Sequence, residues 1–231
     1  MTYIAVDLEM TGLKVKTDHI LEIGALRMES GKPVDTFSAL INPHCTVPEQ
    51  ITQLTGITQE MADNGEELAD VLPHFLAFAG ELPLLGHNLS FDYGFLKQAC
   101  VNAKQPFERT GIDTLKLARR FLPAEQKKNL ESLRTLFSID TGAVHRALAD
   151  AYAAALVYER LAADYGAAAP ALFAPSPLRA NIKKQQPITI PQREQLKRLL
   201  PEHTSTISEP LDVEHLTRSE ASRLIERLLH S

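Results

Sequence analysis

The chain has 231 residues, 44% of them hydrophobic and 23% charged, which is typical of a soluble globular protein. This length accommodates one domain of ordinary size plus an appendage. A formal net charge of −5 argues against a protein that coats long nucleic acids, so any nucleic-acid contact should be short or local. The two cysteines form no CxxC pattern and suggest a reducing compartment. The sequence has no apolar run of the ~18 residues that span a bilayer, and its first strand leaves no room for a signal peptide. We therefore predict a cytoplasmic protein without membrane contact.

Three strands are expected at the start of the chain. Apolar and polar residues alternate in YIAVDLEMTGL (residues 3–13), the period-2 pattern of a strand. Residues 19–29 and 34–41 are expected to form two further strands, and the Ser-Gly-Lys-Pro sequence between them is a hairpin signal. Connections this short favour an antiparallel meander.

Helices and two shorter strands are expected to follow. The clearest pattern is that of residues 66–79, whose apolar residues fall on one face of a helix. An Ala- and Leu-rich helix is expected over residues 147–165, and Ser90 is expected to cap another that ends near Asn102. The shorter elements are a helix before Gly56, a buried strand at 83–86, a brief edge strand at 111–113 and helices at 114–121 and 129–137.

The composition changes after residue 166. Residues 167–188 hold several Pro, Ala and Ser with little periodicity and are expected to form a linker. We therefore predict a main domain over residues 1–166 and a small helical extension over residues 189–231. In the extension, Pro191 is expected at the first position of one helix, and Thr217 with Glu220 forms a capping box that opens another.

Asp7 and Glu9 are the first residues whose spacing suggests chemistry. Residues two apart on a strand point to the same face, so the two side chains project side by side, about 7 Å apart along the backbone. Carboxylates this close repel each other unless a proton or a cation lies between them, and a divalent metal ion would relieve the repulsion. The alternative is an exposed edge strand with ordinary solvated acids.

Three more groups belong with this pair if the fold brings them to it. Asp92 lies in the first turn of an expected helix, where its alternative role is a favourable interaction with the helix dipole. His145 and Asp150 are five residues apart, so they converge only if His145 precedes the helix and Asp150 lies one turn inside it. A purely structural role at a helix start is the alternative for this second pair.

Together these residues are four carboxylates and one imidazole. Acidic oxygen ligands suit hard divalent ions such as Mg²⁺ or Mn²⁺. Two such ions ~3.5–4 Å apart can clamp the attacking and leaving oxygens of a phosphodiester. His145 would then take a proton from the attacking water, because imidazole is suited to that task near neutral pH.

Three motifs, in this order, resemble those of one enzyme class: VDLEMTGL with Asp7 and Glu9, GHNLSFD with Asp92, and HRALADA with His145 and Asp150. Two further segments, LTGIT (residues 54–58) and DTLKLARRFLP (residues 113–123), also look like that class. In these motifs the chain resembles the DEDD superfamily of 3′–5′ exonucleases in its His-containing subtype, the class of the DNA polymerase III epsilon proofreading subunit. The resemblance covers residues 2–165.

The resemblance implies a fold, a cofactor and a reaction. The fold is an α/β, ribonuclease H-like fold with a mixed sheet of about five strands flanked by helices. The cofactor is a pair of divalent ions, Mg²⁺ or Mn²⁺, bound by Asp7, Glu9, Asp92 and Asp150, with Asp7 shared by both ions. With His145 as general base, water would attack the terminal phosphodiester of a nucleic-acid 3′ end and release a 5′-mononucleotide.

The resemblance also implies positions that border the terminal nucleotide. They are Thr11, Gly12, Leu13, Leu54, Thr55, Asn88 and Phe91. Leu and Phe suit base stacking, which tolerates any sequence. For the last four positions, plain core packing is the alternative.

The extension falls outside the resemblance. Six basic residues make it and the linker locally positive within an acidic chain: Arg179, Lys183, Lys184, Arg193, Lys197 and Arg198. One interpretation is an arm that contacts phosphates, and another is an ordinary solvated face. A third is a helix pair that docks a protein partner or self-associates.

Three functions are compatible with these residues. The first is a 3′–5′ exodeoxyribonuclease acting on single-stranded or frayed DNA ends in repair or proofreading, indicated by LTGIT and HRALADA. The second is an exoribonuclease, because the opening DLEMTGL is similar to that of oligoribonuclease. The third is a non-catalytic module that grips a nucleic-acid end or a protein partner, although no metal ligand is missing from the sequence.

Overall fold

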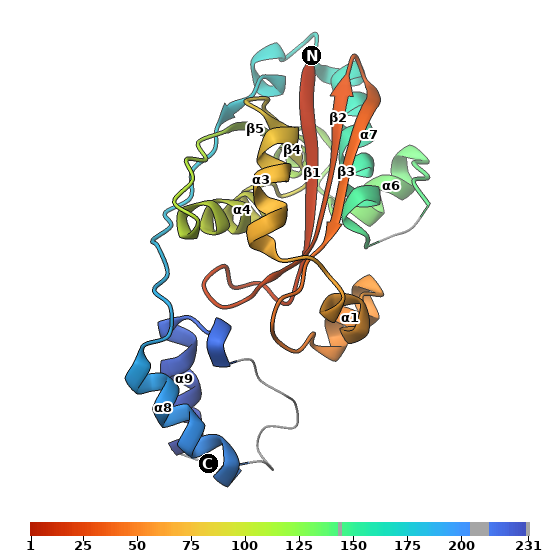
Figure 1. The fold of residues 1–231 in the computed structure, drawn as a ribbon. Coiled ribbons are helices and arrows are strands. Elements are labelled where there is room, and N and C mark those ends of the chain that lie inside the picture. The colour runs from red at the N-terminus through yellow and green to blue at the C-terminus, as the bar shows by residue number, and fades with distance from the viewer. Residues whose placement is uncertain (143–144, 204–212, 230–231) are drawn as a thin grey trace.

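A mixed sheet of six strands forms the centre of the main domain (Figure 1). The computed structural model describes residues 1–142, 145–203 and 213–229. The strands run in the order β3-β2-β1-β4-β5-β6, with β1 antiparallel to β2 and parallel to β4. Their bounds are β1 Thr2–Met10, β2 Ile20–Glu29, β3 Lys32–Leu40, β4 Leu84–Gly86, β5 Thr110–Asp113 and β6 Ser176–Pro177. The expected mixed α/β sheet is confirmed, with one strand more than expected.

Strand β1 lies in the middle of this sheet. Ile4 and Val6 pack into one hydrophobic core, and Tyr3 and Ala5 pack into a second core on the opposite face. The strand is therefore buried on both faces, and the alternative of an exposed edge strand is wrong. The strand ends at Met10, and beyond it the Thr11 N–H donates to the His19 carbonyl while the His19 N–H donates to the Thr11 hydroxyl, which closes the loop between β1 and β2.

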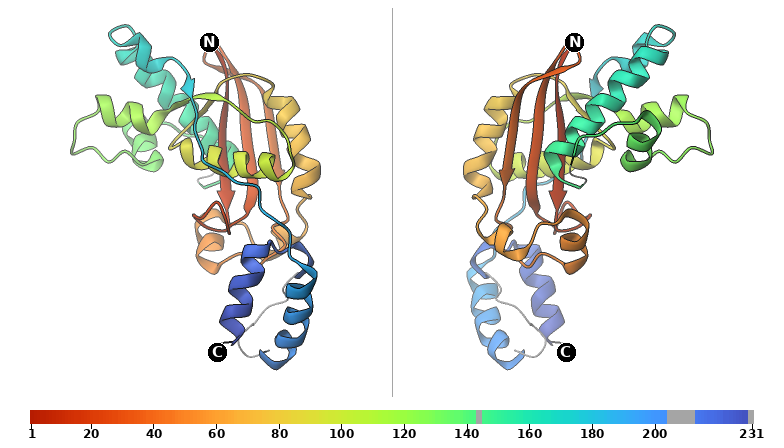
Figure 2. Two further views of the ribbon diagram at one scale, coloured as in Figure 1. Left: turned by 90° about the vertical axis from the view of Figure 1, so that its left-hand side faces the viewer. Right: turned by 90° about the vertical axis from the view of Figure 1, so that its right-hand side faces the viewer.

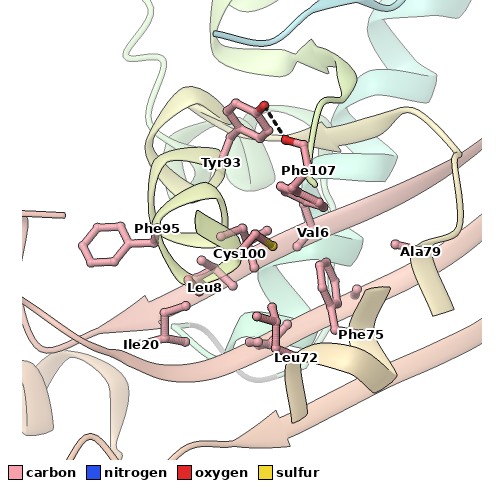
Figure 3. Close-up of a cluster of buried hydrophobic side chains, with 14 of the residues drawn as sticks. Val6, Leu8, Ile20, Leu72, Phe75, Ala79, Tyr93, Phe95, Cys100 and Phe107 are labelled. Atoms are coloured by element: carbon pink, nitrogen blue, oxygen red, sulfur yellow. Dashed lines mark hydrogen bonds between the residues drawn. The ribbon is translucent and has the colours of Figure 1, made fainter. Parts of the chain in front are cut away.

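Helices cover both faces of the sheet (Figure 2). On one side lie α3 and α4, whose side chains surround Val6 and Leu8 (Figure 3). On the other side lie α5, α6 and the long α7. The helices of the main domain are α1 Glu49–Thr55, α2 Gln59–Asp63, α3 Leu68–Ala79, α4 Ser90–Asn102, α5 Thr114–Phe121, α6 Leu130–Phe137 and α7 Ala147–Tyr165.

The start of α7 approaches β2 very closely. A Cβ atom built on Gly24 would lie 2.1 Å from the backbone nitrogen of Leu148, so only glycine fits at this position. Alanines occupy most of the buried face of α7 and permit the same close approach along β1. The contact brings the first turn of α7 to the sheet, beside the end of β1.

Several expected boundaries differ from the structure. Leu89, not Ser90, precedes α4 as its N-cap, and Ser90 is the first helical residue. Helix α2 was not expected; Thr58 caps it by accepting a hydrogen bond from the Met61 N–H. Strand β5 is not an edge strand, because β6 pairs with it. Part of the expected linker thus joins the domain, and Phe173 in the same segment is buried in the core around α7.

Within its described residues, 189–203 and 213–229, the extension contains two α-helices, α8 Ile190–Leu199 and α9 Arg218–Leu229. Together with Ile188, which precedes α8, their apolar faces form a separate small core that contains Leu196, Ala221, Leu224, Ile225 and Leu228. Thr217 and Glu220 form the expected capping box, whereas Pro191 is the second residue of α8 rather than the first. Among the described residues, no helix is long and apolar enough to cross a membrane.

Candidate active site

A hollow of about 310 Å³ opens at the carboxyl end of β1. Its walls come from β1 and the loop after it, from α1, and from the first turns of α4 and α7 together with α6. All five candidate catalytic residues line it: Asp7, Glu9, Asp92, His145 and Asp150. The fold therefore brings together side chains that are up to 143 residues apart in the sequence.

Three of the carboxylates form a tight cluster. Asp7, Glu9 and Asp150 each offer an oxygen atom, and these atoms lie within 4.8 Å of one another. Burial, followed by repulsion from Asp92 and Glu9, raises the pKa of Asp7 well above its ordinary value. Burial and the charge of Asp150 raise the pKa of Glu9 to about 8. Negative charge at this position is thus costly unless a cation compensates it.

Asp92 lies beside this cluster without belonging to it. Its side chain is 4% exposed, and one carboxylate oxygen accepts a hydrogen bond from the backbone N–H of Leu8 at 3.1 Å. Burial raises the pKa of Asp92 to about 7, although this hydrogen bond acts in the opposite direction. Asp92 therefore joins α4 to β1 and adds negative charge next to Asp7.

His145 and Asp150 have the relation that their spacing requires. His145 precedes α7, and Asp150 lies one turn inside the helix, where its backbone N–H donates to Arg146. The His145 Nδ1 atom lies 4.0 Å from an Asp150 carboxylate oxygen. With 40% of its side chain exposed, His145 is accessible to water in the hollow.

Arg134 is a member of the site that no sequence motif indicated. It lies on α6, and its Nη1 donates to an Asp150 carboxylate oxygen at 3.1 Å. Burial raises the pKa of Asp150, while the charges of His145 and Arg134 lower it. Arg134 therefore fixes the position of one carboxylate of the cluster.

A second unpredicted pair, Glu22 and Arg146, fixes the start of α7. Glu22 lies opposite Glu9 on β2 and is 2% exposed. Its carboxylate accepts hydrogen bonds from Arg146 Nη2 at 2.7 Å, from Arg146 Nε at 3.1 Å and from the Ala147 N–H at 3.0 Å. Because Arg146 directly follows His145, this clamp holds both His145 and Asp150 at the end of β1.

Replacing Glu22 with glutamine is expected to lower the free energy of unfolding by about 1–3 kcal/mol. This value is below the ~3–5 kcal/mol typical of a broken buried pair, because 37% of the Arg146 side chain is exposed to solvent. Urea denaturation measures the change, with Glu29→Gln at the exposed end of β2 as the matched control. Equal stability of the two variants would contradict the clamp.

Most of the residues expected to border the terminal nucleotide line the same hollow. They are Gly12, Leu13, Leu54, Thr55 and Phe91. Leu13 and Leu54 are 79% and 51% exposed, so Leu54 is not a core residue. Thr11 and Asn88 do not line the hollow: the Thr11 hydroxyl accepts from the His19 N–H, and the Asn88 N–H donates to Asp113.

The family model of the RNase_T exonucleases matches residues 4–158, a segment that contains every residue of the hollow. The chain belongs to this exonuclease family. One curated relative of this chain is DNA polymerase III subunit epsilon of Aquifex aeolicus, which is 34% identical to it over 161 residues. The match covers 69% of this chain and 80% of that protein. The PolC-type DNA polymerase III of Clostridium perfringens is 37% identical over 153 residues, 66% of this chain but only 11% of the relative.

Solved structures agree with the family. Exonuclease X in complex with 5′ overhanging duplex DNA has a TM-score of 0.59 and 28% identity, and the match covers 71% of this chain and 93% of that one. Exonuclease I of E. coli in complex with a dT13 oligonucleotide has a TM-score of 0.62 at 21% identity, over 74% of this chain and 42% of that one. The second likeness shows the shared fold alone. The residues after 158, which include the strand β6 and the whole extension, lie outside the family match.

Proposed function

We propose that this exonuclease hydrolyses the terminal phosphodiester at the 3′ end of DNA, single-stranded or frayed, and releases 5′-mononucleotides. The observation that carries the proposal is the cluster of Asp7, Glu9 and Asp150 oxygens within 4.8 Å, with His145 at its rim. The proposal assigns the chain to the His-containing DEDD subtype. It also assigns Asp92 to the ligand set, on the strength of its charge next to Asp7.

The residues at the end of β1 fit divalent ions. Oxygen donors of carboxylates are the preferred ligands of Mg²⁺ and Mn²⁺. Burial raises the pKa values of Asp7, Glu9 and Asp92, and repulsion between neighbouring carboxylates adds to this effect at Asp7 and Glu9, so a bound cation would stabilise their charged forms. Asp7, Glu9, Asp92 and Asp150 would hold two ions. When bound, such a pair activates the attacking water and stabilises the charge that develops on the leaving oxygen.

The protein side chains have separate roles in this reaction. His145 accepts the proton of the attacking water, and Arg134 and the Glu22–Arg146 clamp hold Asp150 and His145 in place. The exposed side chains of Leu13 and Leu54, together with Phe91 in the same hollow, offer apolar surface to the terminal base. Stacking of this kind does not depend on the base sequence.

DNA is favoured as the substrate by the relatives, among them an epsilon subunit of DNA polymerase III and an exonuclease in complex with 5′ overhanging duplex DNA. An exoribonuclease is the second candidate, because the segment DLEMTGL is similar to that of oligoribonuclease. A non-catalytic module is disfavoured, since every candidate metal ligand and His145 line one hollow.

A 5′-labelled single-stranded DNA is expected to be shortened to a ladder in the presence of Mg²⁺ or Mn²⁺, and to remain intact in EDTA. Fully paired, frayed and mismatched duplexes and an RNA of the same sequence, assayed in parallel, measure substrate preference. Faster turnover of RNA would select the second candidate. Inert DNA and RNA with both metals would reject the proposed function altogether.

A further inference from the structure

A second hollow, of about 440 Å³, lies between the main domain and the extension and is lined by cationic side chains. We call it the basic hollow and define its charged residues as Lys16, Lys183, Lys184, Arg218 and Arg223. No carboxylate is among its described lining residues; the others are Gln98, Asn181, Ile182, Gln185, Gln186 and Ser219. Five positive charges thus gather at one place in a chain whose net charge is −5.

Three segments that are distant in the sequence build this hollow. Lys16 comes from the loop between β1 and β2, Arg218 and Arg223 come from α9, and the two other lysines come from residues 179–187, which we call the strap. The strap runs in extended form past α4 to the extension (Figures 1 and 2). The hollow therefore exists only where the extension meets the main domain.

Side-chain hydrogen bonds hold the strap against the main domain. Gln185 donates to the Lys16 carbonyl at 2.8 Å and its N–H donates to Asn102 at 3.0 Å, while Gln98 donates to the Lys183 carbonyl at 3.1 Å. These contacts use the backbone carbonyls of Lys16 and Lys183 and leave the side chains of both lysines out of the contact. Both lysines are exposed and line the basic hollow.

The cations of the basic hollow differ from other basic residues of the extension. Arg193 and Lys197 form ion pairs with Glu214 at 2.8 and 3.6 Å. None of the five cations of the basic hollow forms an ion pair with a carboxylate in the described part of the chain. Like charges gathered without counter-charge repel one another, so a polyanion is the ligand that this hollow would bind favourably.

The basic hollow and the active site share one loop. Leu13 lines the active-site hollow, and Lys16, three residues later, lines the basic hollow. Three residues of fully extended chain span at most about 11 Å, so the two hollows are close neighbours. A strand whose 3′ end reaches the carboxylates is thus within a few nucleotides of the five cations.

We propose that the basic hollow binds the phosphodiester backbone of the substrate strand, on the 5′ side of the terminal nucleotide. Lys and Arg contact phosphates regardless of base sequence, which suits an enzyme that must accept any terminal base. The inference rests on the proposed function for the identity of the polyanion. It gives the strap and the extension a role: each contributes two of the five cations, and together they tether long substrates.

The test is the double variant Lys183→Glu/Lys184→Glu, compared with Lys32→Glu/Arg160→Glu. The control carries the same charge change on exposed residues of β3 and the far half of α7, which line neither hollow. Two substrates are used, a 20-nucleotide single strand and the p-nitrophenyl ester of thymidine 5′-monophosphate, which is too short to span both hollows. The test variant should raise KM for the strand about tenfold and leave turnover of the ester unchanged, while the control changes neither.

Binding of the labelled 20-mer, followed by fluorescence anisotropy in EDTA, provides a readout that needs no catalysis. Losing two phosphate contacts should reduce the slope of log K against log salt concentration by about 1.4, at ~0.7 per contact for a single strand. An unchanged KM, affinity and salt slope would overturn the inference. The inference would also be overturned if the double variant bound thymidine 5′-monophosphate more weakly but the 20-mer as tightly as the wild-type protein does, because the ligand would then be a small phosphate ester.

If the wild-type protein cleaves neither substrate, the proposed function is wrong, and the anisotropy measurement still decides the role of the basic hollow.

Discussion

Replacing Asp7 with asparagine is expected to abolish exonuclease activity, with a loss of about 10³-fold or more in kcat. Asp7 contributes an oxygen atom to the cluster that it forms with Glu9 and Asp150. The repulsion between the Asp7 carboxylate and the other two carboxylates is the reason for proposing a cation among them. An amide carries no negative charge, so the variant holds its cations less tightly. A loss of ~4 kcal/mol of transition-state stabilisation corresponds to about 10³-fold in rate.

The same substitution should stabilise the metal-free protein. Folding raises the pKa of Glu9 from 4.5 to about 8 and that of Asp92 from 3.8 to about 7. A group whose pKa is raised on folding contributes stability that is fully present below its unfolded pKa and is lost as the pH rises through its folded pKa. In EDTA, the Tm of the wild-type protein should therefore fall between about pH 5 and pH 9, most steeply near pH 7–8.

Asp7→Asn should flatten this pH dependence and raise the Tm at pH 8 in EDTA, because it removes one of the repelling charges. Mg²⁺ should raise the Tm of the wild-type protein at pH 8 more than that of the variant. Asp35→Asn, on the exposed β3, is the matched control and should leave activity and both Tm values unchanged. If the Asp7→Asn variant retained activity, the assignment of Asp7 as a metal ligand would be wrong, whatever the stability of the variant.

The residues that could be predicted from the sequence are those with a local pattern or a family motif. Period-2 alternation placed Asp7 and Glu9 on one face of β1, and the five-residue spacing correctly required His145 to precede α7. The Thr217–Glu220 capping box was also predictable, because both partners lie within one helical turn. In each case the interaction that decides the geometry is short in sequence.

The residues and elements that escaped prediction depend on tertiary contacts. Glu22 and Arg146 are 124 residues apart, and neither stands out in a sequence where acidic and basic residues are common. Strand β6 has two residues, one of them a proline, and exists because β5 presents an edge to it. The basic hollow likewise depends on where the strap places two lysines relative to Lys16. Such features follow from tertiary packing, which no local pattern encodes.

Replacing His145 with alanine is expected to lower kcat by about 10²–10⁴-fold, the usual contribution of a general base. His145 lines the hollow and lies 4.0 Å from Asp150, but its ring is not in the cluster of ligand oxygens. The variant should therefore keep the Tm gain on adding Mg²⁺ that Asp7→Asn loses. This difference separates a proton acceptor from a metal ligand with two measurements on purified protein.

Rescue by imidazole tests the role of His145 directly. Because 40% of the His145 side chain is exposed, truncation to alanine leaves a space that opens to solvent and can admit a free imidazole molecule. Added imidazole should restore part of the kcat of His145→Ala and leave Asp7→Asn inactive, since a free base cannot replace a missing metal ligand. Equal responses of the two variants, or loss of Mg²⁺ stabilisation in His145→Ala, would show that His145 organises the metal site instead of accepting the proton.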